Sequence, residues 1–445
     1  MSTETVERPP LSALILYGLG QLGWSLTTYS VANTLNYFYM PPEIGKQAMF
    51  PMFIPTEVLF LGMTYLGLIA FGGRFFDALI DPLVAQFSDK MPSGKWGKRR
   101  KFMALGALPL ALCSVLVFIP LANNSSAVNL FWLCITLLLH YLFFAIYVIP
   151  YMALIGELGH HTTDRLRIST IISVTWALGF ILGTTLPLLQ TGFEKLNYNS
   201  VLAFQLSVAV CSFVGLVFML LPVFFLNENK YAKQGDSDGS FWDSMLEVIR
   251  WKNFQIFAFS NFFYWLALNF IQTGMIYYIT VLFGMEKQMA TLFGLISFIC
   301  SFLFYPFITL MVKKIGKKKM LRLGYAVFLV VFIVMLSPIN AQLAFYTVAV
   351  LASLPLAIFG ILPNSMIADE IEAYELAGGQ NRSGMFFAVN AFTMKLGISV
   401  ANLLLPSLLI FGKSSENDWG IRLTVVAAAL FCVLGFITLA KYKER

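Results

Sequence analysis

Charged side chains are scarce in this sequence. Asp, Glu, Lys and Arg together make up 12% of the 445 residues, whereas hydrophobic residues make up 58%. Soluble globular domains carry about 25% charged residues, so this composition excludes that class. Long polar stretches are also scarce. Residues 227–253 form the one extended polar break between apolar runs. The chain is therefore predicted to be an all-α polytopic membrane protein, since a membrane barrel would instead show short alternating segments.

Cysteine and histidine are rare as well, and this argues against several kinds of site. The five cysteines lie inside apolar runs without paired spacing, so we expect no disulfide, no metal centre and no cofactor. His160 and His161 are adjacent, but no Ser-His-Asp or Cys-His arrangement surrounds them, so we expect no enzyme active site. The net charge of +7 is attributed to basic loops that face anionic lipid headgroups, and no nucleic-acid partner is expected.

Apolar segments of the length needed to cross a bilayer recur along the chain. About 20 apolar residues span the hydrocarbon core as a helix. The segments form two sets of six, which predicts an N-terminal six-helix half at 1–226, a cytoplasmic linker at 227–253 and a C-terminal six-helix half at 254–445. The twelve predicted spans are 12–36, 57–88, 102–122, 128–156, 167–190, 203–226, 254–284, 289–312, 320–338, 341–367, 385–411 and 420–440.

Lys and Arg concentrate in alternate loops, which sets the expected orientation. Basic residues cluster at 90–101, 313–322 and 441–445, whereas the opposite loops hold isolated lysines such as Lys46 and Lys413. Short cytoplasmic loops retain basic side chains, so both termini are expected in the cytoplasm of a multi-pass protein of the plasma or inner membrane. The N-terminal stretch MSTETVERPP lacks a basic region before the first span, so no cleaved signal peptide is expected.

The same basic loop appears in both halves. Trp96-Gly97-Lys98-Arg99-Arg100-Lys101 follows the second span, and Lys314-Ile315-Gly316-Lys317-Lys318-Lys319 follows the eighth. A same-orientation repeat of six spans is the arrangement of major facilitator transporters, whose substrate site lies between the halves.

Two aspartates interrupt the second apolar segment. Asp77 and Asp81 are four residues apart, so they lie on one face of a helix. An ionisable side chain near the bilayer centre costs roughly 2.5–3.5 kcal/mol, and such residues usually bind or relay a cation. Two carboxylates one turn apart also repel, which favours capture of a proton or a sodium ion. Arg74 lies three residues before Asp77, and a structural ion pair between them would leave Asp81 alone for function.

Around this pair the sequence resembles a known family. Residues 73–82 (GRFFDALIDP), Ser88-Asp89 and residues 96–100 (WGKRR) are similar to the signature of the glycoside–pentoside–hexuronide:cation symporters, the melibiose-permease family. Residues 149–167 and 366–397 resemble two further blocks of that family, so the resemblance covers nearly the whole chain. It implies the major facilitator fold and cation-coupled symport of a small organic solute, such as a sugar, glycoside or uronate, by alternating access.

A residue-by-residue comparison with the family implies that Asp77 and Asp81 bind the cation. By the same comparison, Lys395 matches a lysine of the family's eleventh helix. Three polar positions of melibiose permease are replaced here. Its sugar-binding aspartate on the first helix falls on Ser25, an aspartate on the fourth helix on Val148, and an arginine on the fifth helix on Ile172. Valine and isoleucine cannot hydrogen-bond a sugar, so either other polar groups recognise the substrate or the substrate is an amphiphile such as a lysolipid.

The remaining candidates follow from position and residue type. Lys395 lies about ten residues after the Arg382-Ser383 turn, roughly 15 Å into its helix, so we expect it to face inward and, with Arg74, to couple the cation to transport. The coupling ion stays open between Na⁺ and H⁺, and a non-transporting receptor or scaffold is the alternative function. The expected partners are a small-molecule substrate and the bilayer, for a monomer. Candidates for substrate contacts are Ser25, Tyr264, Trp265, Asn261, Asn269, Gln272 and Asn364. Candidates for a cytoplasmic gate are Asp89, Arg99, Arg100 and Asp369.

Overall fold

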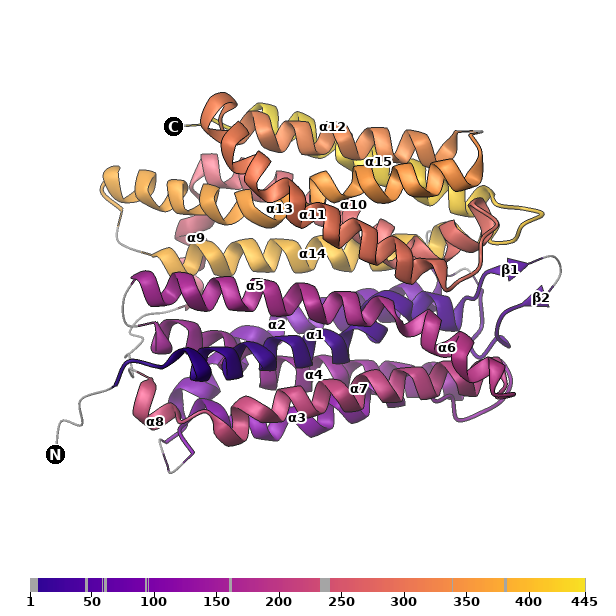
Figure 1. Ribbon diagram of the computed structural model, residues 1–445, viewed down its shortest axis with the longest axis horizontal. Helices are drawn as coiled ribbons and strands as arrows, with labels where there is room; N and C mark the ends of the chain where they lie inside the picture. The colour runs from indigo at the N-terminus through magenta and orange to yellow at the C-terminus, as the bar shows by residue number, and fades with distance from the viewer. Residues whose placement is uncertain are drawn as a thin grey trace. The chain divides into compact units, whose positions relative to one another are not determined.

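Long helices make up most of the computed structural model (Figure 1), which describes residues 7–44, 47–57, 59, 62–92, 94, 96–159, 162–232, 241–337, 339–379 and 382–444. The elements are α1 (Leu11–Tyr39), β1 (Glu43–Ile44), β2 (Gln47–Ala48), α2 (Tyr65–Lys90), α3 (Arg99–Leu116), α4 (Ala127–Leu158), α5 (Thr162–Thr184), α6 (Leu186–Lys195), α7 (Ser200–Phe225), α8 (Glu228–Tyr231), α9 (Phe241–Ile249), α10 (Lys252–Tyr277), the π-helix η2 (Tyr278–Leu282), α11 (Met289–Ile315), α12 (Lys317–Leu336), α13 (Ala341–Leu376), α14 (Ser383–Leu409) and α15 (Trp419–Ala440).

The helices match the predicted spans. Within the described residues, nine helical stretches are long and apolar enough to cross a membrane, and these coincide with the fourth to twelfth predicted segments. Helices α1, α2 and α3 occupy the first three. Several boundaries were wrong, since α3 ends at Leu116 rather than at residue 122 and α13 ends at Leu376 rather than at residue 367. Helix α2 begins at Tyr65 rather than at residue 57, and the fifth segment breaks at Thr185, where Pro187 lacks the N–H that a continuous helix would need.

Backbone contacts divide the chain into two compact units that alternate along the sequence. The first contains Met1–Phe38, Phe50–Pro55 and Phe76–Asp238. The second contains Tyr39–Met49, Thr56–Phe75 and Gly239–Arg445. Helix α2 therefore contributes its N-terminal part to the second unit and the rest to the first. The division into halves at residues 227–253 stays a prediction.

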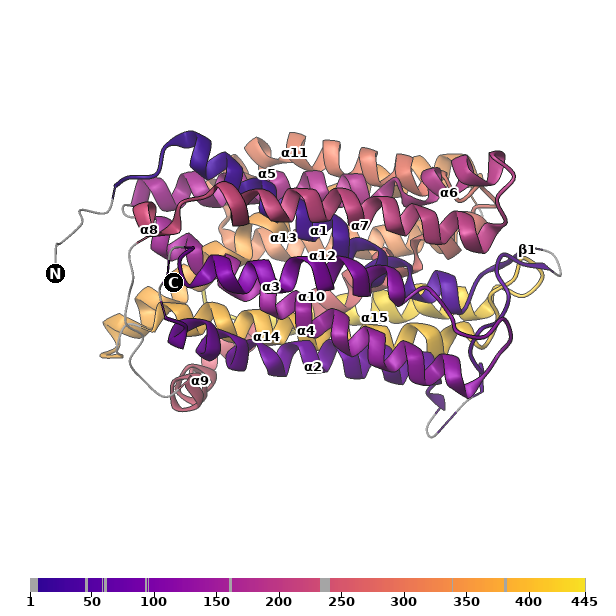
Figure 2. The same ribbon diagram turned by 90° about the horizontal axis from the view of Figure 1, so that it is seen from below.

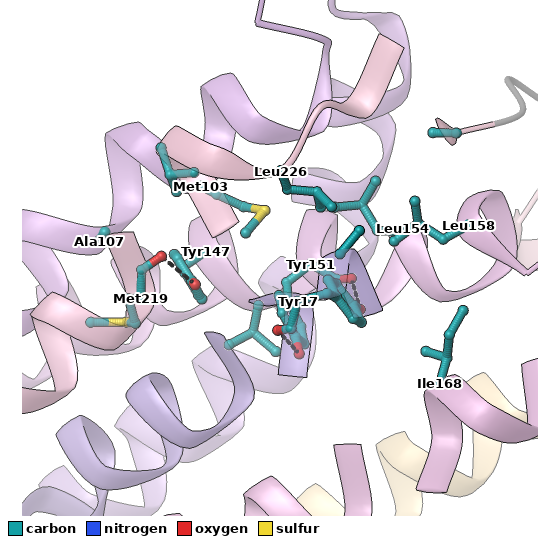
Figure 3. Close-up of a cluster of buried hydrophobic side chains, with 14 of the residues drawn as sticks. Tyr17, Met103, Ala107, Tyr147, Tyr151, Leu154, Leu158, Ile168, Met219 and Leu226 are labelled. Carbon is teal, nitrogen blue, oxygen red and sulfur yellow. Dashed lines mark hydrogen bonds between the residues drawn. The ribbon is translucent and has the colours of Figure 1, made fainter. Parts of the chain in front are cut away.

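In the first unit, α3, α4 and α7 pack side by side (Figures 1 and 2), and tyrosines join α1 to α4 and α4 to α7. The rings of Tyr17 and Tyr151 are stacked with centroids 4.3 Å apart, and each hydroxyl donates to the backbone carbonyl of the other residue (Figure 3). The hydroxyl of Tyr147 donates to Met219 O of α7 at 2.9 Å. All three side chains are fully buried, so these bonds satisfy hydroxyls that water cannot reach.

Small residues bring α1 and α7 close together. A Cβ atom on Gly23 would lie 2.6 Å from Gly215 O, and a Cβ atom on Gly215 would lie 2.1 Å from the hydroxyl oxygen of Thr27. Helices in a membrane gain packing energy from such close backbone approach. A larger side chain at either glycine would force α1 away from α7.

A carboxylate from α8 caps the N-terminus of α3. Glu228 accepts hydrogen bonds from the backbone N–H groups of Lys98, Arg99 and Arg100 at 2.8, 3.0 and 2.8 Å. The first N–H groups of a helix lack intrahelical partners and carry partial positive charge, so an anion there is stabilising. Gly97, at φ +76°, leaves room for this carboxylate, because a Cβ atom would lie 2.3 Å from it.

In the second unit, α10 packs against α14 and α15, and hydroxyl groups join α10 to its neighbours. The hydroxyl of Tyr325 donates to Ser260 O at 2.6 Å, and the hydroxyl of Ser260 lies 3.1 Å from Gly435 O. Tyr278, the first residue of η2, has its hydroxyl 2.9 Å from that of Thr424 on α15. These contacts fix α10 within the unit.

A short hairpin from the first part of the sequence completes the second unit. Strand β1 pairs antiparallel with β2, and Glu43 N also donates to Lys413 O at 3.1 Å. The Lys413 ammonium lies 3.3 Å from the Glu43 carboxylate and donates to Pro41 O at 2.9 Å. Burial lowers the pKa of Lys413, and Glu43 opposes that shift. The hairpin is therefore tied to the loop between α14 and α15.

We predict that Glu228→Gln lowers the stability of the purified protein by about 1–2 kcal/mol, because the amide has one acceptor oxygen and no charge for the N-terminus of α3. The apparent melting temperature in detergent measures this. The matched control is Glu286→Gln, whose exposed carboxylate accepts a hydrogen bond from the nearby Gln288. Equal melting temperatures for both variants would contradict the role assigned to the cap.

Candidate functional site

The two aspartates of α2 lie in the middle of their helix. Asp77 is the thirteenth of the 26 residues of α2 and is 0% exposed. Asp81 follows one turn later and is half-buried, as is Arg74 one turn earlier. All three residues therefore share one face of α2.

Lys395 lies in the middle of α14. It is the thirteenth of 27 residues and is 8% exposed. The hydroxyl of Ser399 donates to Lys395 O at 2.8 Å, and Asn402 is buried on the same helix. A charged side chain buried in this way needs a compensating group, and the inward orientation of Lys395 stays a prediction.

The substrate candidates on α10 and α13 differ in their surroundings. Tyr264 is a packing residue, because its ring is stacked on Phe359 with centroids 3.7 Å apart. Asn269 is buried, and its backbone carbonyl oxygen accepts a hydrogen bond from the Thr273 hydroxyl. Trp265 and Gln272 are half-buried, and Asn364 is exposed.

One polar pair on α10 and α14 contains a residue that the sequence analysis missed. The Asn261 amide donates to Asn390 Oδ1 at 2.8 Å, and Asn261 is 3% exposed. The sequence around an asparagine in an apolar segment does not indicate which residue it bonds. The pairing of Asn390 with Asn261 could therefore be recognised only from the fold.

The positions that the resemblance aligns with charged residues of melibiose permease are neutral or apolar in the first unit. Val148 is buried within the hydrophobic core of α1, α3, α4 and α7, and Ile172 packs against that core. Ser25 is buried and accepts a hydrogen bond from the Gln21 amide at 3.0 Å. Gln21 was not expected as a site residue, because a single glutamine in an apolar run has many structural explanations.

Arg99 and Arg100, predicted as gate residues, make fixed contacts inside the first unit. The Arg99 guanidinium lies 2.8 Å from the Glu157 carboxylate and donates to the Ser88 hydroxyl at 2.8 Å. Arg100 donates to Val223 O, the last turn of α7, at 2.7 Å. These bonds join α2, α3, α4 and α7. The Asp89 side chain lies outside the described residues.

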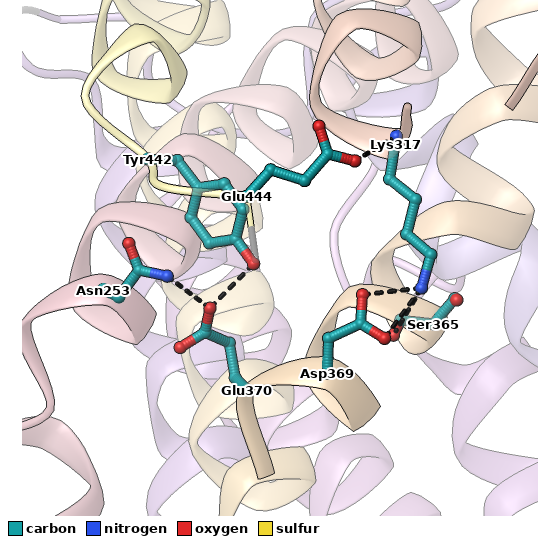
Figure 4. Close-up of polar contacts among 7 residues, drawn as sticks. All are labelled: Asn253, Lys317, Ser365, Asp369, Glu370, Tyr442 and Glu444. Carbon is teal, nitrogen blue, oxygen red and sulfur yellow. Dashed lines mark hydrogen bonds and ion pairs between the residues drawn. The ribbon is translucent and has the colours of Figure 1, made fainter. Parts of the chain in front are cut away.

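Asp369, the gate candidate of the second unit, forms an ion pair with Lys317 (Figure 4). Lys317 Nζ donates to both carboxylate oxygens at 2.8 and 2.6 Å. The backbone N–H of Lys317 donates to Glu444, so the C-terminal residues cap α12. The ion pair therefore links Asp369 on α13 to Lys317 at the start of α12.

Next to this pair, Glu370 anchors the C-terminal residues. Its carboxylate accepts hydrogen bonds from the Asn253 amide and from the Tyr442 hydroxyl at 2.7 Å (Figure 4). It also accepts a hydrogen bond from Trp251 Nε1 at 2.8 Å. Burial and this bond to Glu370 raise the pKa of Tyr442. Glu370 is 2% exposed and was not singled out from the sequence, because its three donors come from distant segments.

We predict that Arg99→Lys lowers stability by about 1–3 kcal/mol, because an ammonium cannot replace the guanidinium that bonds Glu157 and Ser88 together. Melting temperature measures the loss, and Arg167→Lys is the control because Arg167 is exposed. A variant that keeps wild-type stability while its transport rate falls would show that Arg99 acts as a gate rather than as a structural link.

Comparison with known proteins agrees with this architecture. Residues 16–443 match the family described as "MFS/sugar transport protein". The chain is 25% identical to the inner membrane symporter YicJ of Escherichia coli (strain K12), over 87% of this chain and 83% of that protein. It is 22% identical to the isoprimeverose transporter of Lactiplantibacillus pentosus, over 92% of this chain and 82% of that protein.

Solved structures agree on the fold. The crystal structure of the nucleoside transporter NupG superimposes with a TM-score of 0.62 and 13% identity, covering 97% of this chain and 99% of that one. At this identity the likeness concerns the fold alone. The predicted major facilitator fold and the resemblance to sugar symporters are confirmed, and the chain belongs to the MFS/sugar transport protein family as a multi-pass protein of the cell membrane.

Proposed function

We propose that this protein is a cation-coupled symporter that moves a sugar-like solute by alternating access. In this proposal Asp77 and Asp81 bind the coupling cation, and Lys395 takes part in coupling that binding to transport. One chain provides all three groups, so transport requires a monomer only.

The observation that carries the proposal is the complete burial of Asp77 in the middle of a membrane-length helix. A carboxylate at this depth costs roughly 2.5–3.5 kcal/mol on insertion scales, and ionisable residues placed there usually bind or relay an ion. Asp81 lies one turn away on the same face, and the repulsion between the two carboxylates increases the gain from binding a cation.

Lys395 supports the coupling step. It is the thirteenth residue of α14, as Asp77 is of α2, and it is 8% exposed whereas Asp77 is 0% exposed. A bound cation offsets the negative charge of the two carboxylates. The cation therefore changes the free energy of the conformational change, which is the coupling that symport requires. Arg74 assists from the turn before Asp77.

The coupling ion is Na⁺ or H⁺, and the donor set accommodates either. A proton needs one carboxylate, whereas a sodium ion needs several oxygen ligands. Val148 removes the third carboxylate that the resemblance would supply. Uptake into proteoliposomes driven separately by a sodium gradient and by a pH gradient distinguishes the two ions.

The sugar-like nature of the substrate is supported by the family and by the isoprimeverose transporter among the relatives. On α10 and α14, the amide groups of Asn261 and Asn390 provide neutral donors and acceptors suited to hydroxyl groups. A lysolipid remains the alternative substrate class. We infer that Asn390 joins Asn261, Asn269 and Gln272 as a substrate contact.

We predict that Asp81→Asn abolishes cation-driven accumulation in proteoliposomes but keeps exchange of internal for external substrate, because the empty and loaded carriers then carry the same charge at this position. Asp77→Asn should act in the same way, and Lys395→Ala should uncouple or abolish transport. The control is Asp418→Asn, which removes a carboxylate that pairs with Arg422 at the start of α15.

Accumulation of substrate against its gradient by both Asp77→Asn and Asp81→Asn would mean that the carboxylates are structural. An unchanged transport rate in Lys395→Ala would remove the lysine from the coupling mechanism while leaving the cation site in place.

A further inference from the structure

Helices α12 and α15 of the second unit pack against each other, and the start of α12 lies beside the end of α15 (Figure 1). The Lys318 ammonium, in the first turn of α12, donates to Ala440 O at 2.8 Å and to Tyr442 O at 2.5 Å. One turn further, the guanidinium carbon of Arg322 lies 4.3 Å from the centroid of the Phe436 ring on α15. This cation–π contact holds the guanidinium at the seam between the two helices.

Arg322 has hydrogen-bonding capacity that the described residues do not use. The side chain is half-buried, and its Nε atom is buried without an acceptor among those residues. The carboxylates that contact the start of α12 are bonded elsewhere, since Asp369 binds Lys317 Nζ and Glu444 accepts from the Lys317 backbone N–H (Figure 4). A partly desolvated guanidinium is stabilised by an anion, and a group from outside the chain can supply one.

The repeated basic loop offers an internal comparison for this position. Gly97 and Gly316 lie shortly before α3 and α12 and have φ values of +76° and +87°. Arg322 is the sixth residue after Gly316, and the sixth residue after Gly97 is Met103. Met103 is fully buried in the hydrophobic core of the first unit. An uncharged residue serves at this place in the first unit, so the charge of Arg322 needs an explanation other than helix packing.

Apolar side chains are exposed beside Arg322 on both helices. Lys319, Arg322 and Leu323 occupy positions i, i+3 and i+4 of α12, so they share one face of the helix. Leu323 and Val330 of α12 are exposed, and so is Ile437 of α15. In a chain that spans the bilayer, exposed apolar side chains of this kind contact the acyl chains of lipids.

Exposed lysines lie at the same end of the two helices. Lys319 follows the start of α12 by two residues, and Lys441 follows the end of α15. Arg322 lies five residues after the first residue of α12, which is about 7.5 Å along the helix. It is therefore placed between the lysines and the apolar side chains, in the order in which a phospholipid carries its polar headgroup, its phosphate and its acyl chains.

We propose that the seam of α12 and α15 binds an anionic phospholipid, whose phosphate contacts Arg322 and whose acyl chains lie along Leu323 and Ile437. This site is separate from the transport function and does not depend on the transported solute. Lys319 and Lys441 attract the net negative charge of the lipid and repel the ammonium of a zwitterionic headgroup such as phosphatidylcholine. A free phosphate ion shares the anionic chemistry but buries no apolar surface against the helices.

The test is native mass spectrometry of the purified full-length protein in detergent, titrated separately with dioleoylphosphatidylglycerol and dioleoylphosphatidylcholine at one ionic strength. We expect the phosphatidylglycerol to bind at least fivefold more tightly than the phosphatidylcholine, because the attraction to a surface lysine or arginine alone gives a factor of this size. Inorganic phosphate is the third probe. It should leave the melting temperature of the protein unchanged at concentrations where phosphatidylglycerol raises it.

Two variants assign the contact to this seam. Arg322→Gln removes the guanidinium and should weaken binding of phosphatidylglycerol about tenfold, the effect of losing a hydrogen bond between charged groups. Lys319→Gln changes an exposed side chain, so folding is unaffected, and should weaken binding about fivefold. The matched control is Arg250→Gln, which removes the same charge from an exposed arginine just after α9 and should keep the wild-type affinity. Melting temperatures without lipid show that each variant is folded.

Several results would overturn this inference. One is the absence of lipid binding or equal affinity for the two lipids, and another is unchanged affinity for phosphatidylglycerol in folded Arg322→Gln and Lys319→Gln. Stabilisation by inorganic phosphate alone would assign Arg322 to a soluble anion. A dimer that dissociates in Arg322→Gln would assign this face to a second copy of the chain. The proposed symport stands or falls separately, because it is measured by uptake.

Discussion

The bilayer interior provides no water for polar groups, and this constraint explains most of the architecture. Backbone groups are satisfied within helices, and buried side chains must find partners in neighbouring helices. The reciprocal bonds between Tyr17 and Tyr151, the Arg99 contact with Glu157 and the Glu370 anchor are local solutions to the same requirement. Because a buried charge is costly in this setting, the carboxylates of α2 are the residues proposed above to bind a cation.

Much of the fold was predictable from the sequence, because each span is a local property of 20–30 apolar residues. The polar interruption at residues 227–253 and the basic loops are also local signals. The start of α2 was missed because residues 57–64 are apolar enough to resemble part of a span. Hydropathy alone does not indicate where a helix begins. The hydroxyl of Thr64, which accepts from Gly67 N at 3.1 Å, marks that beginning.

Candidate residues could be named from the sequence where one residue type is costly to bury by itself, and their roles stay predictions. Asp77, Asp81 and Lys395 are rare charges in apolar segments, so their positions alone drew attention to them. Glu228, Asn390 and Gln21 could not be found in this way, because their roles depend on partners that are close only after folding. Tyr264 illustrates the opposite case, since an aromatic residue suited to a sugar turned out to pack against Phe359.

The hairpin of β1 and β2 has a consequence for the way the chain can be divided. Residues 39–49 and 56–75 precede most of the first unit in sequence but are built into the second. A protein cut in the linker would therefore give a C-terminal fragment that lacks the Glu43 partner of Lys413 and the helix turn that packs at Gly67 against Leu403. The two fragments are complementary rather than autonomous, and synthesis of the N-terminal portion supplies parts that the C-terminal portion needs to finish folding.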